Sequence, residues 1–334
     1  MIRKLLPLLA ISTIPALLLP LQAGAQNIPA TVSPSAYPNK PIRMIVPFPP
    51  GGGTDILARI VGTRVGEAGK WTVVIDNKPG AGGTIGISEA VRQPANGYEM
   101  VMGQKDNLAV APWLYKVHYD PSKDLTAVAL VAESPLVIVT AASSPFKTMA
   151  DVIAAAKAAP DTITYGSPGN GTTTHLVGEM FKLAAGIRIG HVPYKGSNPA
   201  VIDTISGQVS MMVSSIPSAM SQVKAGKLRA LAVTSTRRSS SLPDVPTIAE
   251  STSLKDFDVS SWYGLFMPAN APKDVVATVN AAVNKQLALP EVKEAIHAQG
   301  AEARPMTPQA FQTLVAEDFH KWKDIVAASG ARLE

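Results

Sequence analysis

Short runs of β-branched residues alternate with helical patterns along the first third of the chain, and this order limits the fold more than any other feature. The first two runs each lead into a glycine-rich turn and then a helical pattern, the first of which has one apolar face. The strands are expected at Ile42–Val46, Thr72–Asp76 and Met100–Gly103, and the helices at Thr54–Val65 and Thr84–Arg92. This rhythm predicts an α/β protein with a parallel, doubly wound sheet.

The same rhythm restarts further along the chain. Helical patterns separate the expected strands, and one of them opens at Ser197-Asn198-Pro199 with proline at the first helical position. The expected strands are Leu136–Thr140, Ile163–Tyr165, Arg188–Val192, Val209–Val213 and Leu228–Thr234. The sequence therefore predicts a second α/β unit.

The C-terminal part is helical and has no strand rhythm of its own. We expect its helices to pack back on the first unit, which makes the second unit an insertion. Lobe 1 is then residues 38–134 and 262–334, and lobe 2 is residues 135–261, with a ligand cleft between them. Each lobe is expected to be a mostly parallel sheet with helices on both faces. Two such lobes suit a hinged ligand trap.

The N-terminus has the order of a secretory signal peptide. Arg3 and Lys4 precede an almost wholly apolar stretch, residues 5–21, and small residues follow it. We expect residues 1–25 to be a cleaved signal peptide and residues 26–37 to be a disordered leader. A membrane anchor is the alternative, but the stretch is shorter than the roughly 20 residues that a span needs. The sequence thus predicts export to the periplasm.

Composition narrows the class of protein further. The 334 residues include no cysteine, so an exported fold has to be held by burial rather than by disulfides. Lys and Arg exceed Asp and Glu by 30 to 25, an excess too small and too scattered to bind nucleic acid. We therefore expect no nucleic-acid partner, and we expect a monomer.

The first candidate binding motif lies where the first expected strand gives way to a helix. Glycines let the backbone approach a ligand closely, and the unpaired N–H groups of a helix start attract an anion. A tight turn without a ligand is the alternative. For Asp55 we favour a bond to a ligand or to ordered water, which selects among acids, over a role as a helix cap. The candidates are Pro49, Gly51, Gly52, Gly53, Thr54 and Asp55.

Two further glycine-rich turns follow expected strands. The turn with Gly82 and Gly83 departs from the dinucleotide pattern because Ile85 stands where the third glycine belongs. It is either a carboxylate cradle or a loop that caps a helix. The turn in lobe 2 has the same order as the first turn: a strand, a glycine turn and a hydroxyl-rich helix start. Two such turns facing each other would hold both ends of a small acid. Its candidates are Ser167, Gly169, Asn170, Gly171, Thr172, Thr173 and Thr174.

Signals for catalysis and for metal binding are weak. The histidines, at positions 118, 175, 191, 297 and 320, lack metal-ligand spacing, and no Gly-x-Ser-x-Gly motif occurs. Trp262 and Tyr263 lie near an expected crossing between the lobes, where they either cover a ligand or belong to the core. The sequence predicts no catalytic residue, no metal and no cofactor.

Several short motifs occur in order along the chain after the signal peptide. They include Tyr37-Pro38, Pro47-Phe48-Pro49-Pro50-Gly51-Gly52, Asn77-Lys78-Pro79-Gly80, His191-Val192-Pro193-Tyr194-Lys195-Gly196 and Trp262-Tyr263-Gly264-Leu265. Together they resemble the receptors of the tripartite tricarboxylate transporters, also called the Bug family. The resemblance implies a two-lobed periplasmic binding fold that closes on a ligand, in most cases a carboxylate. Amides and hydroxyls of the two facing turns would hold it, often through waters.

One stretch departs from the family pattern. Relatives usually have small hydroxyl residues after the third strand, whereas this chain has Gln104-Lys105-Asp106-Asn107. Charged side chains could therefore reach the ligand, and Lys105 and Asp106 become candidate contacts. Ser214 and Trp262 complete the candidate set.

The resemblance favours a transport receptor that passes its carboxylate to membrane permease subunits. A sensory adaptor that signals to a membrane kinase is the second hypothesis. A periplasmic enzyme on the same fold is the least favoured, because no paired nucleophile and base is visible. Aromatic acids, dicarboxylates and tricarboxylates all stay open as the ligand.

Overall fold

The computed structural model describes residues 37–255 and 257–329. The predicted signal peptide, residues 1–25, and nearly all of the predicted leader lie outside these ranges. No helix within the described ranges is long and apolar enough to cross a membrane. The long apolar stretch at Leu125–Ala141 is a β-strand, and most of its residues are buried.

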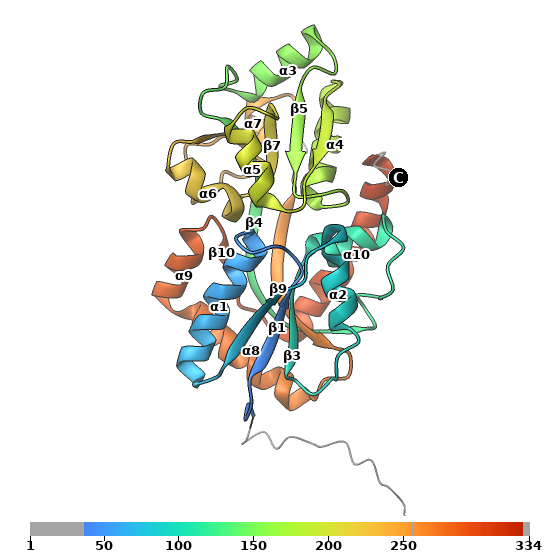
Figure 1. Ribbon diagram of the computed structural model, residues 1–334, viewed down its shortest axis with the longest axis vertical. Coiled ribbons are helices and arrows are strands. Elements are labelled where there is room, and N and C mark those ends of the chain that lie inside the picture. The colour runs from blue at the N-terminus through green and yellow to red at the C-terminus, as the bar shows by residue number, and fades with distance from the viewer. Residues whose placement is uncertain (1–36, 256, 330–334) are drawn as a thin grey trace, which may run out of the picture. The chain divides into compact units, whose positions relative to one another are not determined.

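Lobe 1 is the lower group of elements in Figure 1. Its sheet contains β1 (Ile42–Val46), β2 (Val73–Asn77), β3 (Glu99–Gln104), β9 (Ser260–Pro268), β10 (Glu302–Ala303) and the first part of β4 (Leu125–Ala141). Its helices are α1 (Gly53–Gly69), α2 (Thr84–Ala90), α8 (Lys273–Ala288), α9 (Pro290–His297) and α10 (Pro308–Ser329). Three short segments, η2 (Ala81–Gly83), η3 (Asp106–Val110) and η4 (Ala111–Trp113), lie in its connections.

Lobe 2 is the upper group in Figure 1. Its sheet contains β5 (Thr164–Ser167), β6 (Gly190–Pro193), β7 (Met211–Ser215), β8 (Leu228–Val233) and the last part of β4. Its helices are α3 (Met149–Ala158), α4 (Thr173–Ala185), α5 (Ser197–Ile205), α6 (Ile216–Lys224) and α7 (Ile248–Ser251).

The strand order is β2-β1-β3-β9-β4-β7-β5-β6, with β10 and β8 paired to β4 outside this path. The α/β class predicted from the sequence is confirmed. The expected parallel pairing joins β1 to β2 and β3, and it joins β5 to β6 and β7. The pairings of β4 and β9 are antiparallel. These two central strands therefore add antiparallel pairings that the sequence pattern did not indicate.

Two strands connect the lobes, as Figure 1 shows for β4 and β9. The first part of β4 pairs with β9 as far as Pro135, opposite Ser260. From Leu136 onward, β4 pairs with β7 and β8 of lobe 2. One continuous strand thus belongs to both sheets. The lobe limits expected from the sequence, after residues 134 and 261, fall inside these two strands.

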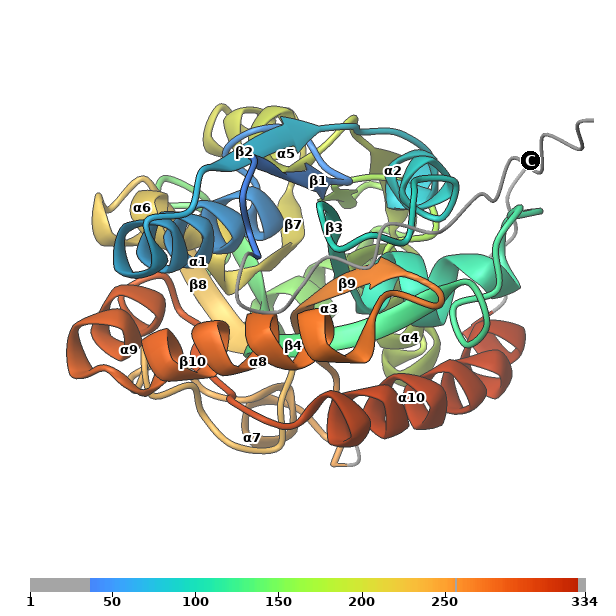
Figure 2. The ribbon, with the colours of Figure 1, turned by 90° about the horizontal axis from the view of Figure 1, so that it is seen from below.

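Alternation along the strands assigns the helices to faces. Met44 and Val46 of β1 pack with α1, α8 and α9, whereas Ile45 faces the opposite side with α2 and α10. Figure 2 shows α1, α8 and α9 lying together beside the sheet of lobe 1. The C-terminal helices α8 and α10 contact β4, and α10 also contacts α4. In lobe 2, α5 and α6 cover one face and α3 and α4 the other.

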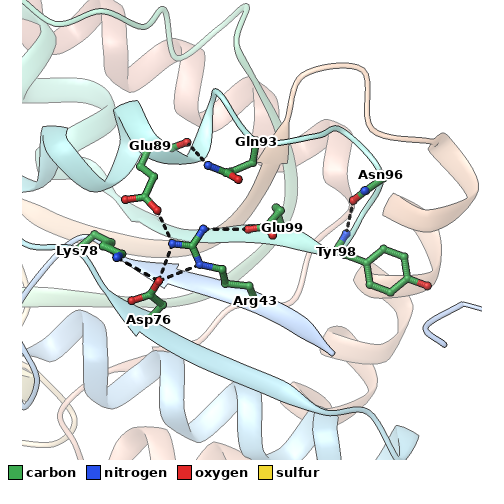
Figure 3. Close-up of polar contacts among 8 residues, drawn as sticks. All are labelled: Arg43, Asp76, Lys78, Glu89, Gln93, Asn96, Tyr98 and Glu99. Atoms are coloured by element: carbon green, nitrogen blue, oxygen red, sulfur yellow. Dashed lines mark hydrogen bonds and ion pairs between the residues drawn. The ribbon is translucent and has the colours of Figure 1, made fainter. Parts of the chain in front are cut away.

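Arg43 on β1 ties three elements of lobe 1 together (Figure 3). Its guanidinium lies 2.6 Å from Asp76 of β2 and 3.3 Å from Glu99 of β3, and it also pairs with Glu89 of α2. Burial lowers the pKa of Arg43, but its hydrogen bonds to Glu89 and Asp76 outweigh burial and raise it. This cluster holds the parallel strands from whose carboxyl ends the first turns extend.

Candidate functional site

The turn between β1 and α1 is fixed by side chains of its own lobe. Asp55, in the first turn of α1, accepts hydrogen bonds from the Gly51 N–H at 2.9 Å and from Arg59 Nε at 2.8 Å. Its second oxygen accepts from Asn77 Nδ2 at 2.9 Å. Burial raises the pKa of Asp55, but these hydrogen bonds outweigh burial and lower it. Both oxygens of Asp55 are therefore engaged inside lobe 1.

The start of α1 meets lobe 2 directly. The Gly53 N–H donates to Ser218 Oγ at 2.8 Å, and Ser218 Oγ lies 2.8 Å from Ser215 Oγ beside the start of α6. A Cβ on Gly53 would lie 2.8 Å from Ser215 Oγ, so the lobes approach this closely only because position 53 has no side chain. Asn198 adds another contact, from its Nδ2 to the Pro50 carbonyl at 3.1 Å.

A chain of hydrogen bonds crosses from α1 to α4. Thr54 Oγ1 donates to Gln104 Oε1, and Gln104 Nε2 donates to Asp106 Oδ2 at 2.7 Å. Asp106 Oδ1 accepts from the Thr173 N–H at 3.1 Å and from the Thr173 hydroxyl. Burial raises the pKa of Asp106, and the bonds from Thr173 and Gln104 oppose that rise. A lobe 1 carboxylate therefore sits on the first amide of a lobe 2 helix.

The chain encloses an inner cavity of about 30 Å³ between the lobes. This volume holds about two water molecules. The first turns of α1, α4, α5 and α6 all contribute to its wall, so the positive ends of four helices point toward one small space. Its lining is Phe48, Pro49, Gly52, Gly53, Thr54, Gln104, Asp106, Leu136, Pro168, Thr174, Ser197, Ser215, Ser218, Ser261 and Tyr263.

A larger outer cavity of about 410 Å³ adjoins the inner one and shares Phe48, Pro49 and Pro168 with it. The glycine turn around η2 and the turn before α4 form much of its wall. Tyr115 lies against both turns: its hydroxyl donates to the Asn170 carbonyl at 2.7 Å, and its ring would be 3.5 Å from a Cβ on Gly82. Its lining beyond the shared residues is Pro79, Gly80, Ala81, Gly82, Gly83, Tyr115, Gly169, Asn170, Pro193, Tyr194, Lys195 and Gly196.

Ten of the residues predicted as ligand contacts line one of the two cavities. Those in the inner cavity are Pro49, Gly52, Gly53, Thr54, Asp106 and Thr174. Those in the outer cavity are Gly82, Gly83, Gly169 and Asn170, and Pro49 belongs to both. Three turns that lie far apart in the sequence are thus brought together.

The other predicted contacts lie behind these cavities. Gly51 and Asp55 brace the first turn, and Gly171, Thr172 and Thr173 shape the start of α4. Ser167 bonds His191, and Ser214 donates to a carbonyl of its own strand while its neighbour Ser215 lines the cavity. Because side chains alternate along a strand, a prediction one residue off points to the wrong face.

Lys105 and Trp262 are placed away from both cavities. Lys105 Nζ lies 2.9 Å from Asp318 Oδ2 of α10, and Trp262 Nε1 donates to the same oxygen at 2.6 Å. Trp262 also packs edge-on against Phe311, with ring centroids 5.6 Å apart. In this structure, neither side chain lines either cavity, and both bind Asp318 of α10 instead.

A histidine pair supports the turn before α4. The rings of His175 and His191 stack with centroids 4.1 Å apart. His175 Nδ1 accepts from the Gly171 N–H at 3.2 Å, and His191 Nε2 lies 2.7 Å from Ser167 Oγ. Burial lowers the pKa of both rings, that of His191 to about 3. Both imidazole rings are therefore expected to be neutral near pH 7, where they support the turn before α4 through hydrogen bonds and stacking. Among the described residues, no group of three or more His, Asp or Glu is placed to hold a metal ion.

Sequence reasoning missed several wall residues. Ser197 was identified only as a helix start, and Ser215 and Ser218 were not among the candidates. The signal was the same hydroxyl-rich helix start that marked the first and third turns. What the sequence lacked was the sheet order, which brings the starts of α5 and α6 to the same space as α1 and α4.

The two-lobed α/β fold, with cavities between the lobes, is that of a solute-binding protein, and the comparisons agree. The model of the "Tripartite tricarboxylate transporter family receptor" matches residues 57–331, and the chain belongs to this family. BugT of Bordetella pertussis is 35% identical over 310 residues, which covers 92% of this chain and 95% of BugT.

Two solved structures share the fold. R. palustris Rpa4515 with adipate has a TM-score of 0.86 and 33% identity, and covers 89% of this chain and 100% of its own. MatC from Rhodopseudomonas palustris with bound malate has a TM-score of 0.81 and 29% identity, and covers 87% of this chain and 100% of its own.

Proposed function

We propose that this protein is a periplasmic receptor that captures a small carboxylate between its lobes and delivers it to the permease subunits of a tripartite tricarboxylate-type transporter. The observation on which this rests most is the convergence of four helix starts on one enclosed space. Amides and hydroxyls at helix starts stabilise a carboxylate without a basic side chain. Among the described residues, the inner wall has neither lysine nor arginine.

The start of α1 supplies the clearest free donors. The first intrahelical bond of α1 is from the Ile56 N–H to the Gly52 carbonyl. The amides of Thr54 and Asp55, which precede it, donate no hydrogen bond to a described residue. Thr54 lines the inner cavity, so we assign this helix start as the anchor for a ligand carboxylate. The adipate and malate of the two solved relatives support a carboxylate as the ligand class.

We infer from the family that the ligand is delivered to a membrane permease and that the receptor acts in the periplasm. A receptor of a membrane transporter has to meet its ligand outside the inner membrane, which agrees with the expected signal peptide. Both walls of the cleft come from one chain, so we propose that a monomer binds the ligand and releases it unchanged. Asp55 is then a structural residue of the first turn, because its partners lie in lobe 1.

Calorimetry with matched ligand pairs tests this function. Aromatic acids, dicarboxylates and tricarboxylates are each compared with the corresponding carboxamide, which has the same shape and lacks the charge. We expect at least one acid to bind with a stoichiometry of one per chain and its amide to bind far more weakly. Equal binding of acid and amide, or no binding by any acid, would contradict the proposal. Recovery of a chemically altered ligand would contradict the absence of turnover.

A further inference from the structure

The wall of the inner cavity contains a carboxyl group of the protein, that of Asp106. Among the described residues that line it, Asp106 is the only Asp, Glu, Lys, Arg or His. The Asp106 residue is buried, with a relative exposure of 6%. Its neighbour Lys105 does not neutralise it directly, because the Lys105 ammonium is engaged by Asp318 at 2.9 Å. A ligand in this cavity therefore meets a carboxylate that belongs to the protein.

Asp106 already occupies one of the anion positions of the cleft. The Thr173 N–H and hydroxyl, at the start of α4, both donate to Asp106 Oδ1. A helix start of this kind is where a second ligand carboxylate would be expected to bind. A ligand carboxylate placed there would have to displace Asp106 or lie beside it, and two carboxylates that share a site repel each other. The α1 and α4 ends of the cleft are therefore chemically different.

Asp106 also has spare capacity to accept a hydrogen bond. A carboxylate offers about four lone-pair positions. Oδ1 uses two of them for Thr173, and Oδ2 uses one for Gln104. One position on Oδ2 is left for a donor. A hydroxyl, an amide or an ammonium group can fill it, whereas an ionised carboxylate cannot.

From this arrangement we propose that Asp106 takes the place of one ligand carboxylate. Building on the function proposed above, the ligand is a monocarboxylate with an ammonium or another hydrogen-bond donor at its far end. Its carboxylate binds the start of α1 beside Thr54, and its donor end faces Asp106. Asp106 is then the residue that makes this receptor discriminate against dicarboxylates.

The test uses two ligand series of matched shape. One is malonate, propanoate and 3-aminopropanoate, and the other is succinate, butanoate and 4-aminobutanoate, all short because the inner cavity is small and Thr54 and Asp106 are joined through one Gln104 side chain. Dissociation constants are measured by calorimetry for the wild type, for Asp106→Asn and for Asp274→Asn. Asp274 is exposed on α8, so its variant repeats the loss of one charge outside the cleft. Circular dichroism confirms that each variant is folded.

We expect the amino acid of at least one series to bind the wild type at least tenfold more tightly than the matching dicarboxylate. Asp106→Asn should reduce that ratio at least tenfold, and Asp274→Asn should leave it unchanged. A wild type that binds the dicarboxylates as tightly as the amino acids overturns the inference, even if Asp106→Asn fails to fold. So does a ratio that Asp106→Asn leaves unchanged, since the second carboxylate would then lie elsewhere, for example toward Lys195 in the outer cavity. If these probes, together with the wider acid panel, do not bind at all, the proposed function fails as well.

Discussion

The turns that begin α1 and α4 have the same plan but are completed in different ways. Each follows a parallel strand, contains glycines and opens a helix toward the cleft. The α1 turn is braced inside its own lobe by Asp55, so its next amides are left for a ligand. The α4 turn is braced by a histidine pair, and its first amide is occupied by Asp106 of the other lobe. Similar sequence patterns thus produce one open and one occupied anion position.

The largest effect is expected at the point where the two lobes touch. In Gly53→Val, the new side chain would meet Ser215 and Pro217, with its Cβ 2.8 Å from Ser215 Oγ. Overpacking of this kind costs about 1–3 kcal/mol, which corresponds to roughly 5- to 150-fold weaker carboxylate binding. Calorimetry gives the affinity, and small-angle scattering shows whether the saturated protein still closes.

Gly190→Val is the matched control for that variant. Gly190 lies on β6, and a Cβ there would be 3.6 Å from the nearest atom, an ordinary contact. We expect this variant to bind like the wild type. If both variants weaken binding equally, the effect of Gly53→Val is not due to the contact between the lobes.

A smaller effect is expected from Asp55→Asn. This variant tests whether Asp55 braces the α1 turn from within its own lobe. The change removes the charge that bonds Arg59 and braces the Gly51 amide, so the free energy of unfolding should fall by about 1–2 kcal/mol. The order of affinities across a carboxylate panel should not change, because Asp55 has its partners inside lobe 1. A changed order, measured by calorimetry beside a thermal melt, would return Asp55 to the role first expected from the sequence.

The support of the α4 turn should depend on pH. Burial, followed by the charges of His175 and Lys182, lowers the pKa of His191 from its ordinary 6.5 to about 3. Between these pH values the unfolded chain takes up a proton that the folded chain excludes. This contribution to stability is therefore full above pH 6.5 and is lost as the pH falls toward 3.

His191→Gln should flatten the dependence of the melting temperature on pH in this window. Glutamine keeps a polar group near Ser167 and does not titrate. His118→Gln, at an exposed position, is the control and should leave the slope as in the wild type. An unchanged slope in His191→Gln would show that the histidine pair does not set the acid stability of lobe 2.

The smallest effect on binding is expected from Lys105→Gln. The Lys105 ammonium pairs with Asp318 outside both cavities, so affinity for a carboxylate should stay within about twofold of the wild type. A loss of tenfold or more in a folded variant would show that Lys105 acts on the ligand after all.

Much of the fold could be predicted because periodic burial marks strands and helices locally. Val46 and Gly53 stand at element ends that the sequence indicated to within a residue. The length of β4 was not indicated, because Glu133 and Pro135 look like strand breakers. Both are tolerated in the segment that passes between the lobes, where Glu133 pairs with Arg304 at 2.8 Å.

The site was only partly predictable because it depends on distances through space. Glycine turns identify possible anion positions, but they do not show which positions a protein group fills. Asp106 was a candidate because it departs from the family pattern, yet only the hydrogen bonds to Thr173 show that it bridges the lobes. Lys105, the adjacent residue, looked equivalent in sequence and faces α10 instead. Neighbouring residues on a turn point in different directions, and sequence spacing does not resolve them.

A crystal structure with the most tightly bound carboxylate tests the central claim most directly. The account predicts that the ligand carboxylate lies within hydrogen-bond distance of the Thr54 and Asp55 amides at the start of α1. It also predicts that Asp106 keeps its bonds to Thr173 while a donor group of the ligand faces it. A ligand bound outside the cleft, or a carboxylate that has displaced Asp106 from the start of α4, would contradict the account.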